Sequence, residues 1–256
     1  AQAEFRIALK DWPPETLEAY IGKLYPAYWL KVDLPHKIEH AKFVRDAETA
    51  GKSLATSISF GSSAVTELTV LAPDHPWLLS IIAGACAMAG ANIVDAQIYT
   101  TTDGRALDTI SLSREFERDE DEERRANRVA ESIEKALRGE LRLPDMVDKR
   151  ATPKGRIRAF ALEPAVTINN QWSRRYTMVE ITGLDRTGLL YELTATLSKL
   201  NLNIVSAHVA TFGERVVDVF YVTDLMGAQI ASPTRQAAIK RALVALFAGG
   251  DGKAKD

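Results

Sequence analysis

The turn at residues 185–188 combines groups that a binding site for a small zwitterion requires. Asp185 can accept a hydrogen bond from an ammonium group, and Gly188 has no side chain to hold a ligand away from the backbone. An apolar stretch with helical spacing follows, and a helix N-terminus offers unpaired N–H groups and partial positive charge to a carboxylate. Asn203, further along, can add a side-chain amide. The same residues also suit an ordinary turn and helix cap, an alternative that the turn alone leaves open.

The turn is part of an internal repeat. Three pairs of segments keep a separation of 110 or 111 residues along the chain. They are 68–79 with 179–190, 91–94 with 202–205, and 105–108 with 215–218. A constant offset across distinct elements indicates duplication of one structural unit.

Each copy predicts the same order of strands and helices. The expected strands are 66–72, 93–101 and 106–112 in the first copy, and 177–183, 204–211 and 216–223 in the second. A helix begins at Leu78 or Leu189, and a second helix closes each copy, at about 119–138 and after Ser232-Pro233. The fourth strand of each unit can come only from the chain that precedes the other three, at 56–60 in the first copy and 166–170 in the second. We therefore predict two α+β units of order ββαββα.

The rest of the chain organises around these units. We expect a helical connector over 1–51, a first unit over 52–139, a linker over 140–155, a second unit over 156–248 and a disordered tail over 249–256. Within the connector, helical composition over 15–48 is interrupted by Pro26 and Pro35.

Composition excludes several classes of protein. The 256 residues carry a formal net charge of −2, whereas a nucleic-acid binder normally has a basic surplus. The single cysteine, Cys86, lies in an apolar run, and no secretory signal is visible, so we expect a cytoplasmic protein. The most apolar stretch, 78–94, is short for a membrane span and favours a buried helix followed by a strand.

These motifs carry a resemblance to a known family. The duplicated Asp-Arg-x-Gly-Leu-Leu…Asn-Ile pattern resembles ACT domains, ferredoxin-like units that bind amino acids at such turns. Five segments are, more narrowly, similar to the C-terminal region of the bacterial bifunctional uridylyltransferase/uridylyl-removing enzymes. They are Asp185–Tyr191, Asn203–His208, Val217–Thr223, Gly90–Gln97 and Tyr25–Trp29.

The resemblance implies a regulatory role. Enzymes of that family attach uridylyl groups from UTP to the PII signalling protein and remove them when glutamine is abundant, and their ACT pair senses glutamine. By position, the glutamine site of the second unit would comprise Asp185, Arg186, Thr187, Gly188, Leu189, Leu190, Asn203 and Ile204. The corresponding residues of the first unit are Asp74, His75, Trp77, Leu78, Asn92 and Ile93. Trp77 stands where Gly188 stands, behind Pro76, which lacks an N–H, and we expect its bulky indole to fill the first pocket. We therefore expect the second unit to bind.

No catalytic residues are expected in this chain. Gly61-Ser62 is followed by no Asp-x-Asp element, and no His-Asp dipeptide is present, so both family activities, and the Mg²⁺ they need, belong to other domains. His36 and His40 share a helical spacing, but we interpret them as solvated connector residues and expect no metal. Two alternatives remain: another amino-acid sensor or regulatory tail, and a ligand-free dimerisation module built by ACT–ACT association.

Overall fold

The computed structural model describes three stretches of the chain. They are residues 1–60, 65–141 and 162–248. The Gly61-Ser62 turn, most of the predicted linker 140–155 and the predicted tail 249–256 lie outside the described residues.

Four helices form the connector. They are α1 (Gln2–Ala8), α2 (Pro14–Gly22), α3 (Pro26–Lys31) and α4 (Leu34–Thr49). The sequence pattern does not predict α1. Pro26 and Pro35 are expected to interrupt the helical stretch, but each stands in the first turn of a helix, where a missing N–H costs nothing. Asp33 caps α4 by accepting a hydrogen bond from the amide of His36 at 2.9 Å.

The two units repeat the same order of elements. The first contains β1 (Ala55–Phe60), β2 (Val65–Pro73), α5 (Leu78–Ala89), β3 (Ile93–Gln97), β4 (Arg105–Ser113) and α6 (Asp119–Leu137). The second contains β5 (Ala165–Asn169), β6 (Thr177–Leu184), α8 (Leu189–Lys199), β7 (Leu202–Phe212), β8 (Arg215–Asp224) and α9 (Pro233–Ala248). The upstream strands β1 and β5 pair antiparallel with β2 and β6, so the ββαββα prediction is confirmed.

One predicted strand is shorter than expected. β3 ends at Gln97 and not at Thr101, because the chain leaves regular pairing there. The amide of Tyr99 approaches the Asp108 carboxylate at 3.4 Å, and Thr100 keeps only an isolated bridge to Ala106.

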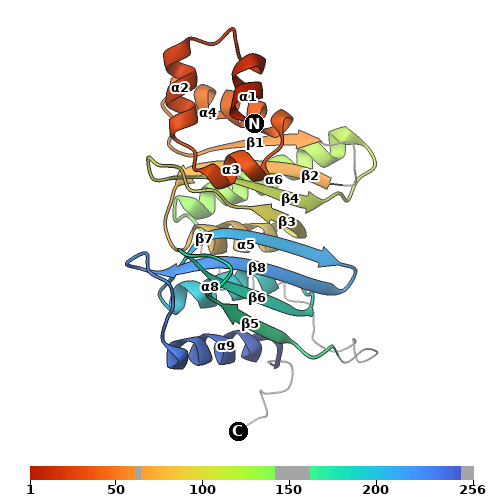
Figure 1. The fold of residues 1–256 in the computed structure, drawn as a ribbon. Coiled ribbons are helices and arrows are strands. Elements are labelled where there is room, and N and C mark those ends of the chain that lie inside the picture. Colours follow the sequence, from red (N-terminus) through yellow and green to blue (C-terminus); the bar gives the residue numbers. More distant parts are fainter. Residues whose placement is uncertain (61–64, 142–161, 249–256) are drawn as a thin grey trace.

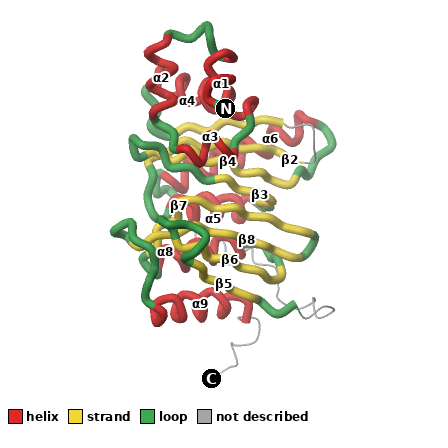
Figure 2. Tube along the Cα trace, viewed as in Figure 1, coloured by secondary structure: helices red, strands yellow, loops and turns green. Residues whose placement is uncertain are grey.

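Both units share one antiparallel sheet of eight strands. Its order is β1-β2-β4-β3-β7-β8-β6-β5, and β3 and β7 join the units edge to edge through Asp95–Gln97 and His208–Ala210. The helices α5, α6, α8 and α9 lie on one face of this sheet, with α5 against α8 at the junction (Figure 1, Figure 2). One apolar core runs under these helices through both units.

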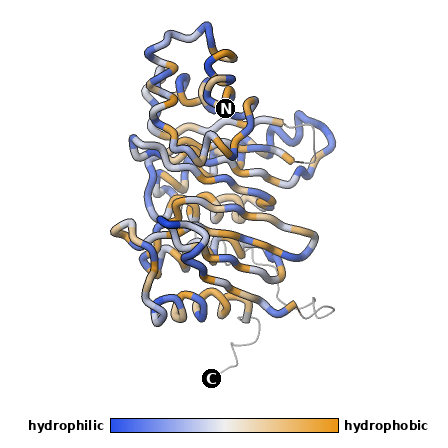
Figure 3. The backbone as a smooth tube through the Cα atoms, viewed as in Figure 1, coloured by the Kyte–Doolittle hydropathy of each residue, from blue (hydrophilic) through white to orange (hydrophobic). Residues whose placement is uncertain are grey.

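The opposite face differs between the units. In the first unit the connector covers it, and Leu71, Tyr99 and Leu107 join a second apolar core with the connector residues. In the second unit, buried and partly exposed residues alternate along β8. Lys31 of the connector reaches only to the ring of Tyr221, 5.6 Å from its centroid. Figure 3 shows apolar stretches along the strands and a hydrophilic segment where α6 begins.

His40 is not a solvated residue, contrary to the sequence interpretation. Its side chain is buried, with Nδ1 3.0 Å from the Tyr28 hydroxyl and Nε2 3.1 Å from Thr109 Oγ1. Burial lowers the pKa of His40 to about 4, because the cationic form is poorly solvated there. His36 is partly exposed and contacts Asp33 and Glu67.

The apolar stretch 78–94 forms α5 and the start of β3, as predicted. Across the described ranges, no helix has the length and hydropathy needed to cross a bilayer. Cys86 is buried on α5, and burial raises the pKa of its thiol to about 12, which keeps it protonated and unreactive.

Candidate functional site

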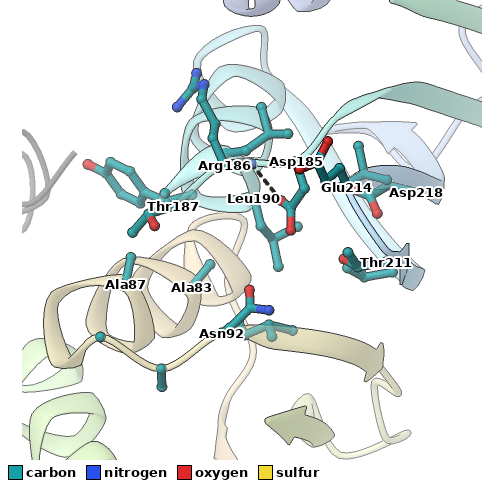
Figure 4. Close-up of a pocket in the computed structure, with 18 of the residues that line it drawn as sticks. Ala83, Ala87, Asn92, Asp185, Arg186, Thr187, Leu190, Thr211, Glu214 and Asp218 are labelled. Atoms are coloured by element: carbon teal, nitrogen blue, oxygen red, sulfur yellow. Dashed lines mark hydrogen bonds between the residues drawn. The ribbon is translucent and has the colours of Figure 1, made fainter. Parts of the chain in front are cut away.

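A cavity of about 360 Å³ lies between the two units, in the size range of small-molecule sites. One wall is the turn before α8, and the facing wall is the C-terminal half of α5 with the residues that follow it (Figure 4). The strand side is formed by β7 and β8. The lining comprises Ala83, Ala87, Gly90, Ala91, Asn92, Ile93, Asp185, Arg186, Thr187, Gly188, Leu189, Leu190, Tyr191, Val209, Thr211, Gly213, Glu214, Val216 and Asp218.

The cavity combines residues from both units. The predicted turn residues 185–190 all line it, but Asn92 and Ile93 of the first unit stand where the sequence analysis placed Asn203 and Ile204. The reason is the antiparallel junction of β3 with β7, which brings the start of each unit's edge strand toward the other unit's turn. A ligand in this cavity therefore contacts both copies at once.

The turn leaves backbone donors available. Gly188 is the residue before α8 and has φ +81°, a left-handed conformation that favours glycine. The amide of Leu189 donates to the Arg186 carbonyl at 3.0 Å. Within the described ranges, the amides of Thr187 and Leu190 donate to no protein acceptor. The helix N-terminus thus presents free N–H groups to the cavity, which suits a carboxylate.

The side chain of Arg186 is engaged elsewhere. Its guanidinium pairs with Glu192 and donates to the Leu246 carbonyl at 3.2 Å, and Figure 4 shows it pointing away from Asn92. Arg186 lines the cavity mainly as backbone and as a brace between α8 and α9. Arg186 therefore positions the turn, and its charge is engaged by Glu192.

Two carboxyl groups face the cavity from the strand side. Asp185 accepts from the Arg186 amide at 2.8 Å, and burial raises its pKa. Asp218 on β8 is 1% exposed, and burial together with the charge of Asp185 raises its pKa to about 7. No described residue hydrogen-bonds to Asp218 Oδ1.

The equivalent position of the first unit is closed. Ser198 on α8 donates to the Pro76 carbonyl at 2.7 Å and seats that helix on the first unit's turn. The Thr100 hydroxyl donates to Asp74 at 2.9 Å, so the matching carboxylate already has a partner. Trp77 remains 41% exposed, so the indole does not fill a pocket, contrary to the expectation.

The remaining predicted site residues of the first unit lie partly at its own turn and partly at the cavity. His75 Nδ1 accepts from the Trp77 amide at 3.3 Å, and Leu78 is buried in the core, so both stabilise the closed turn. Asn92 and Ile93 instead line the open cavity.

Sequence reasoning missed several residues of the cavity. Ala83 and Ala87 were not considered because small apolar residues on a helix carry no chemical signal. Asp218 did have a signal, since it matches Asp108 in the repeat, but a buried strand position gave no reason to place it at a site.

No group of three or more potential metal ligands occurs among the described residues.

Comparison with known proteins agrees with this architecture. Residues 177–237 match the ACT domain family. The bifunctional uridylyltransferase/uridylyl-removing enzyme of Rhodopseudomonas palustris is 67% identical over 258 residues, covering 100% of this chain and 28% of that protein. Those of Bradyrhizobium sp. (strain ORS 278) and Nitrobacter winogradskyi are each 68% identical, covering 100% and 98% of this chain and 28% and 27% of the relatives. The chain thus spans just over a quarter of these relatives' length.

Proposed function

Because the chain belongs to the ACT-containing region of the bifunctional uridylyltransferase/uridylyl-removing enzyme family, we propose that it is the glutamine-sensing regulatory region of such an enzyme. The longer protein would uridylylate and deuridylylate the PII signalling protein in nitrogen regulation. UTP, Mg²⁺ and PII would be bound by its other domains, in the cytoplasm.

The cavity between the units is the observation that carries this proposal. Free amides at Thr187 and Leu190 suit an α-carboxylate, the carboxyl groups of Asp185 and Asp218 suit an α-ammonium, and Asn92 offers an amide to a polar side chain. A ligand with both charges on neighbouring atoms satisfies the two ends together.

The surrounding contacts support a route for the signal. One wall of the cavity is α5, which packs on α6 in the first unit. The connector is tied to the same unit by the Arg105–Glu48 ion pair at 2.5 Å and by the Thr102 amide, which donates to the Lys23 carbonyl at 2.8 Å. A ligand that favours one arrangement of the two units can thus bias the connector, by no more than its differential affinity for the two arrangements.

Calorimetry tests the proposal directly. The chain is titrated with glutamine, glutamate, serine and leucine, and glutamine is expected to bind most tightly. Gly188→Trp copies the closed unit and should abolish binding while the circular-dichroism spectrum stays unchanged. Gly188→Ala is the matched control for backbone strain at φ +81°, and it should retain more affinity than the tryptophan variant.

The outcomes separate the alternatives. Tighter binding of serine or leucine would replace glutamine by another effector and leave the sensing role intact. Failure of all four to bind would favour a ligand-free ACT–ACT dimerisation module, which sedimentation of the chain would then show as self-association.

A further inference from the structure

Asp218 is an unusual residue for the core of a sheet. Its carboxyl group is 1% exposed, one of its oxygens has no partner among the described residues, and it borders the cavity. A buried carboxyl group without a full set of hydrogen bonds is costly. The Ala210 amide donates a hydrogen bond to this carboxyl group, and the described residues offer it no ion pair.

The charges around Asp218 point to a cationic partner. Asp185 and Glu214 line the same cavity, while the guanidinium of Arg186, the one cation among the lining residues, is engaged by Glu192. Opposite them, the first unit contributes Asn92, which is neutral, and small apolar residues. The strand side of the cavity thus carries an excess of carboxyl groups and no free cation within its lining.

We propose that Asp218, together with Asp185, receives the protonated amine of the ligand and makes the site selective for α-amino acids over their desamino, α-hydroxy and α-keto analogues. This inference rests on the proposed function and names the residue that sets its ligand class. An ammonium group donates three hydrogen bonds, and the unpartnered Asp218 Oδ1 is an acceptor for one of them. An analogue without the amine would leave both carboxyl groups unpaired, and sites built around a buried polar partner discriminate strongly against such ligands.

The chain contains its own control for this proposal. Asp108 on β4 is the repeat partner of Asp218, is equally buried and also has one oxygen without a partner among the described residues. It does not line the cavity. Removing the charge at position 108 therefore reproduces the change in the core without touching the site.

The test compares glutamine with its desamino analogue by calorimetry at pH 7.5. In Asp218→Asn, glutamine affinity should fall at least thirtyfold while affinity for the analogue changes less than threefold. In Asp108→Asn, neither affinity should change. Equal glutamine affinity in Asp218→Asn and the unsubstituted chain would overturn the inference alone, whereas an unsubstituted chain that binds no amino acid would remove the proposed function and this inference together.

A second measurement covers the case in which Asp218→Asn does not fold. The unsubstituted chain is titrated with glutamine at pH 6.5 in two buffers of different ionisation enthalpy. Binding of an ammonium beside Asp218 should release a proton, because the carboxyl group must ionise to accept it. Glutamine binding without proton release would overturn the assignment.

Discussion

The two units carry equivalent turns and equivalent buried aspartates, yet the turn of the second unit lines a cavity, whereas α8 contacts the turn of the first unit through Ser198 and Pro76. The difference comes from the helix of the neighbouring unit. Ala83 and Ala87 of α5 line the cavity beside the second unit's turn. Their repeat partners on α8 are Thr194 and Ser198, and Ser198 donates a hydrogen bond to Pro76 in the first unit's turn. A binding motif in one unit is therefore available only if the other unit leaves room for a ligand.

The carboxylates of the two turns show the same contrast. Asp74 is bound by the Thr100 hydroxyl, but no hydrogen bond joins the equivalent Asp185 and Thr211 within the described ranges. The first unit thus satisfies the carboxylate of its own turn. The second unit leaves its polar groups for a ligand.

Placing the α8 residues Thr194 and Ser198 at the equivalent positions of α5 should have the largest effect on glutamine affinity. In Ala83→Thr/Ala87→Ser, the new hydroxyls occupy the cavity, and the one introduced at position 87 can donate to the Thr187 carbonyl. Glutamine affinity should therefore fall about a hundredfold, or about 2.7 kcal/mol. Calorimetry measures the loss. The reverse pair, Thr194→Ala/Ser198→Ala, should leave affinity for the open cavity unchanged, and an equal loss there would contradict the contrast between the units.

Acidity should lower the affinity of the cavity for glutamine. With the pKa of Asp218 at about 7, the carboxyl group is mostly ionised at pH 8 and mostly protonated at pH 6, so glutamine affinity should fall about tenfold between them. The folding stability of the protein without ligand should change with pH in the opposite direction. The folded pKa lies above the unfolded value, so stability is highest below about pH 4 for this group and declines as pH rises toward 7. The affinity profile should flatten in Asp218→Asn, whereas the stability profile should become shallower and keep the part due to Asp108, whose pKa burial also raises. An affinity profile that persists in the variant would assign it to another group.

Gly183 tests the packing of the open unit. A Cβ built at this position would lie 2.3 Å from the ring of Phe247, whereas the first unit has Ala72 at the matching place. Because the ring must move, Gly183→Ala should lower the free energy of unfolding by about 1–2 kcal/mol, measured by urea denaturation. Adding Phe247→Leu should recover part of the loss, and no recovery would place the strain elsewhere.

Removing the hydrogen bond between Ser198 and Pro76 should give the smallest effect. Ser198→Ala removes the hydrogen bond to Pro76 and should lower the free energy of unfolding by about 0.5–1 kcal/mol, with glutamine affinity unchanged. Denaturation and calorimetry on the same sample check both values. A gain of a second binding event would show that this single contact keeps the first position closed.

Much of the fold could be predicted because each element of a unit occurs twice in the sequence, once in each copy of the repeat. The upstream strands β1 and β5 followed from the need for a fourth strand, and Gly90 and Asn201 end their helices in the left-handed conformation that their residue types allow. The helix α1 could not be predicted because seven residues carry too little periodicity. The burial of His40 could not be predicted because it depends on Tyr28 and Thr109, which are distant in sequence.

The candidate site was only partly predictable. The turn residues 185–190 stand out by type, but pairing Asn92 with them requires knowing that β3 and β7 join the units edge to edge. Open edges can pair in several ways, and the sequence of one strand does not specify its partner. Asp218 depends on the same knowledge, since its unpaired oxygen matters only beside a cavity.

The continuous eight-stranded sheet has a consequence for how such a sensor responds. Both walls of the cavity are covalently part of one polypeptide, so their encounter does not depend on how many molecules are present. A pocket assembled between separate chains would be half-formed in dilute solution and complete in concentrated solution. Here the ligand concentration at half-saturation should stay constant from scarce to abundant protein.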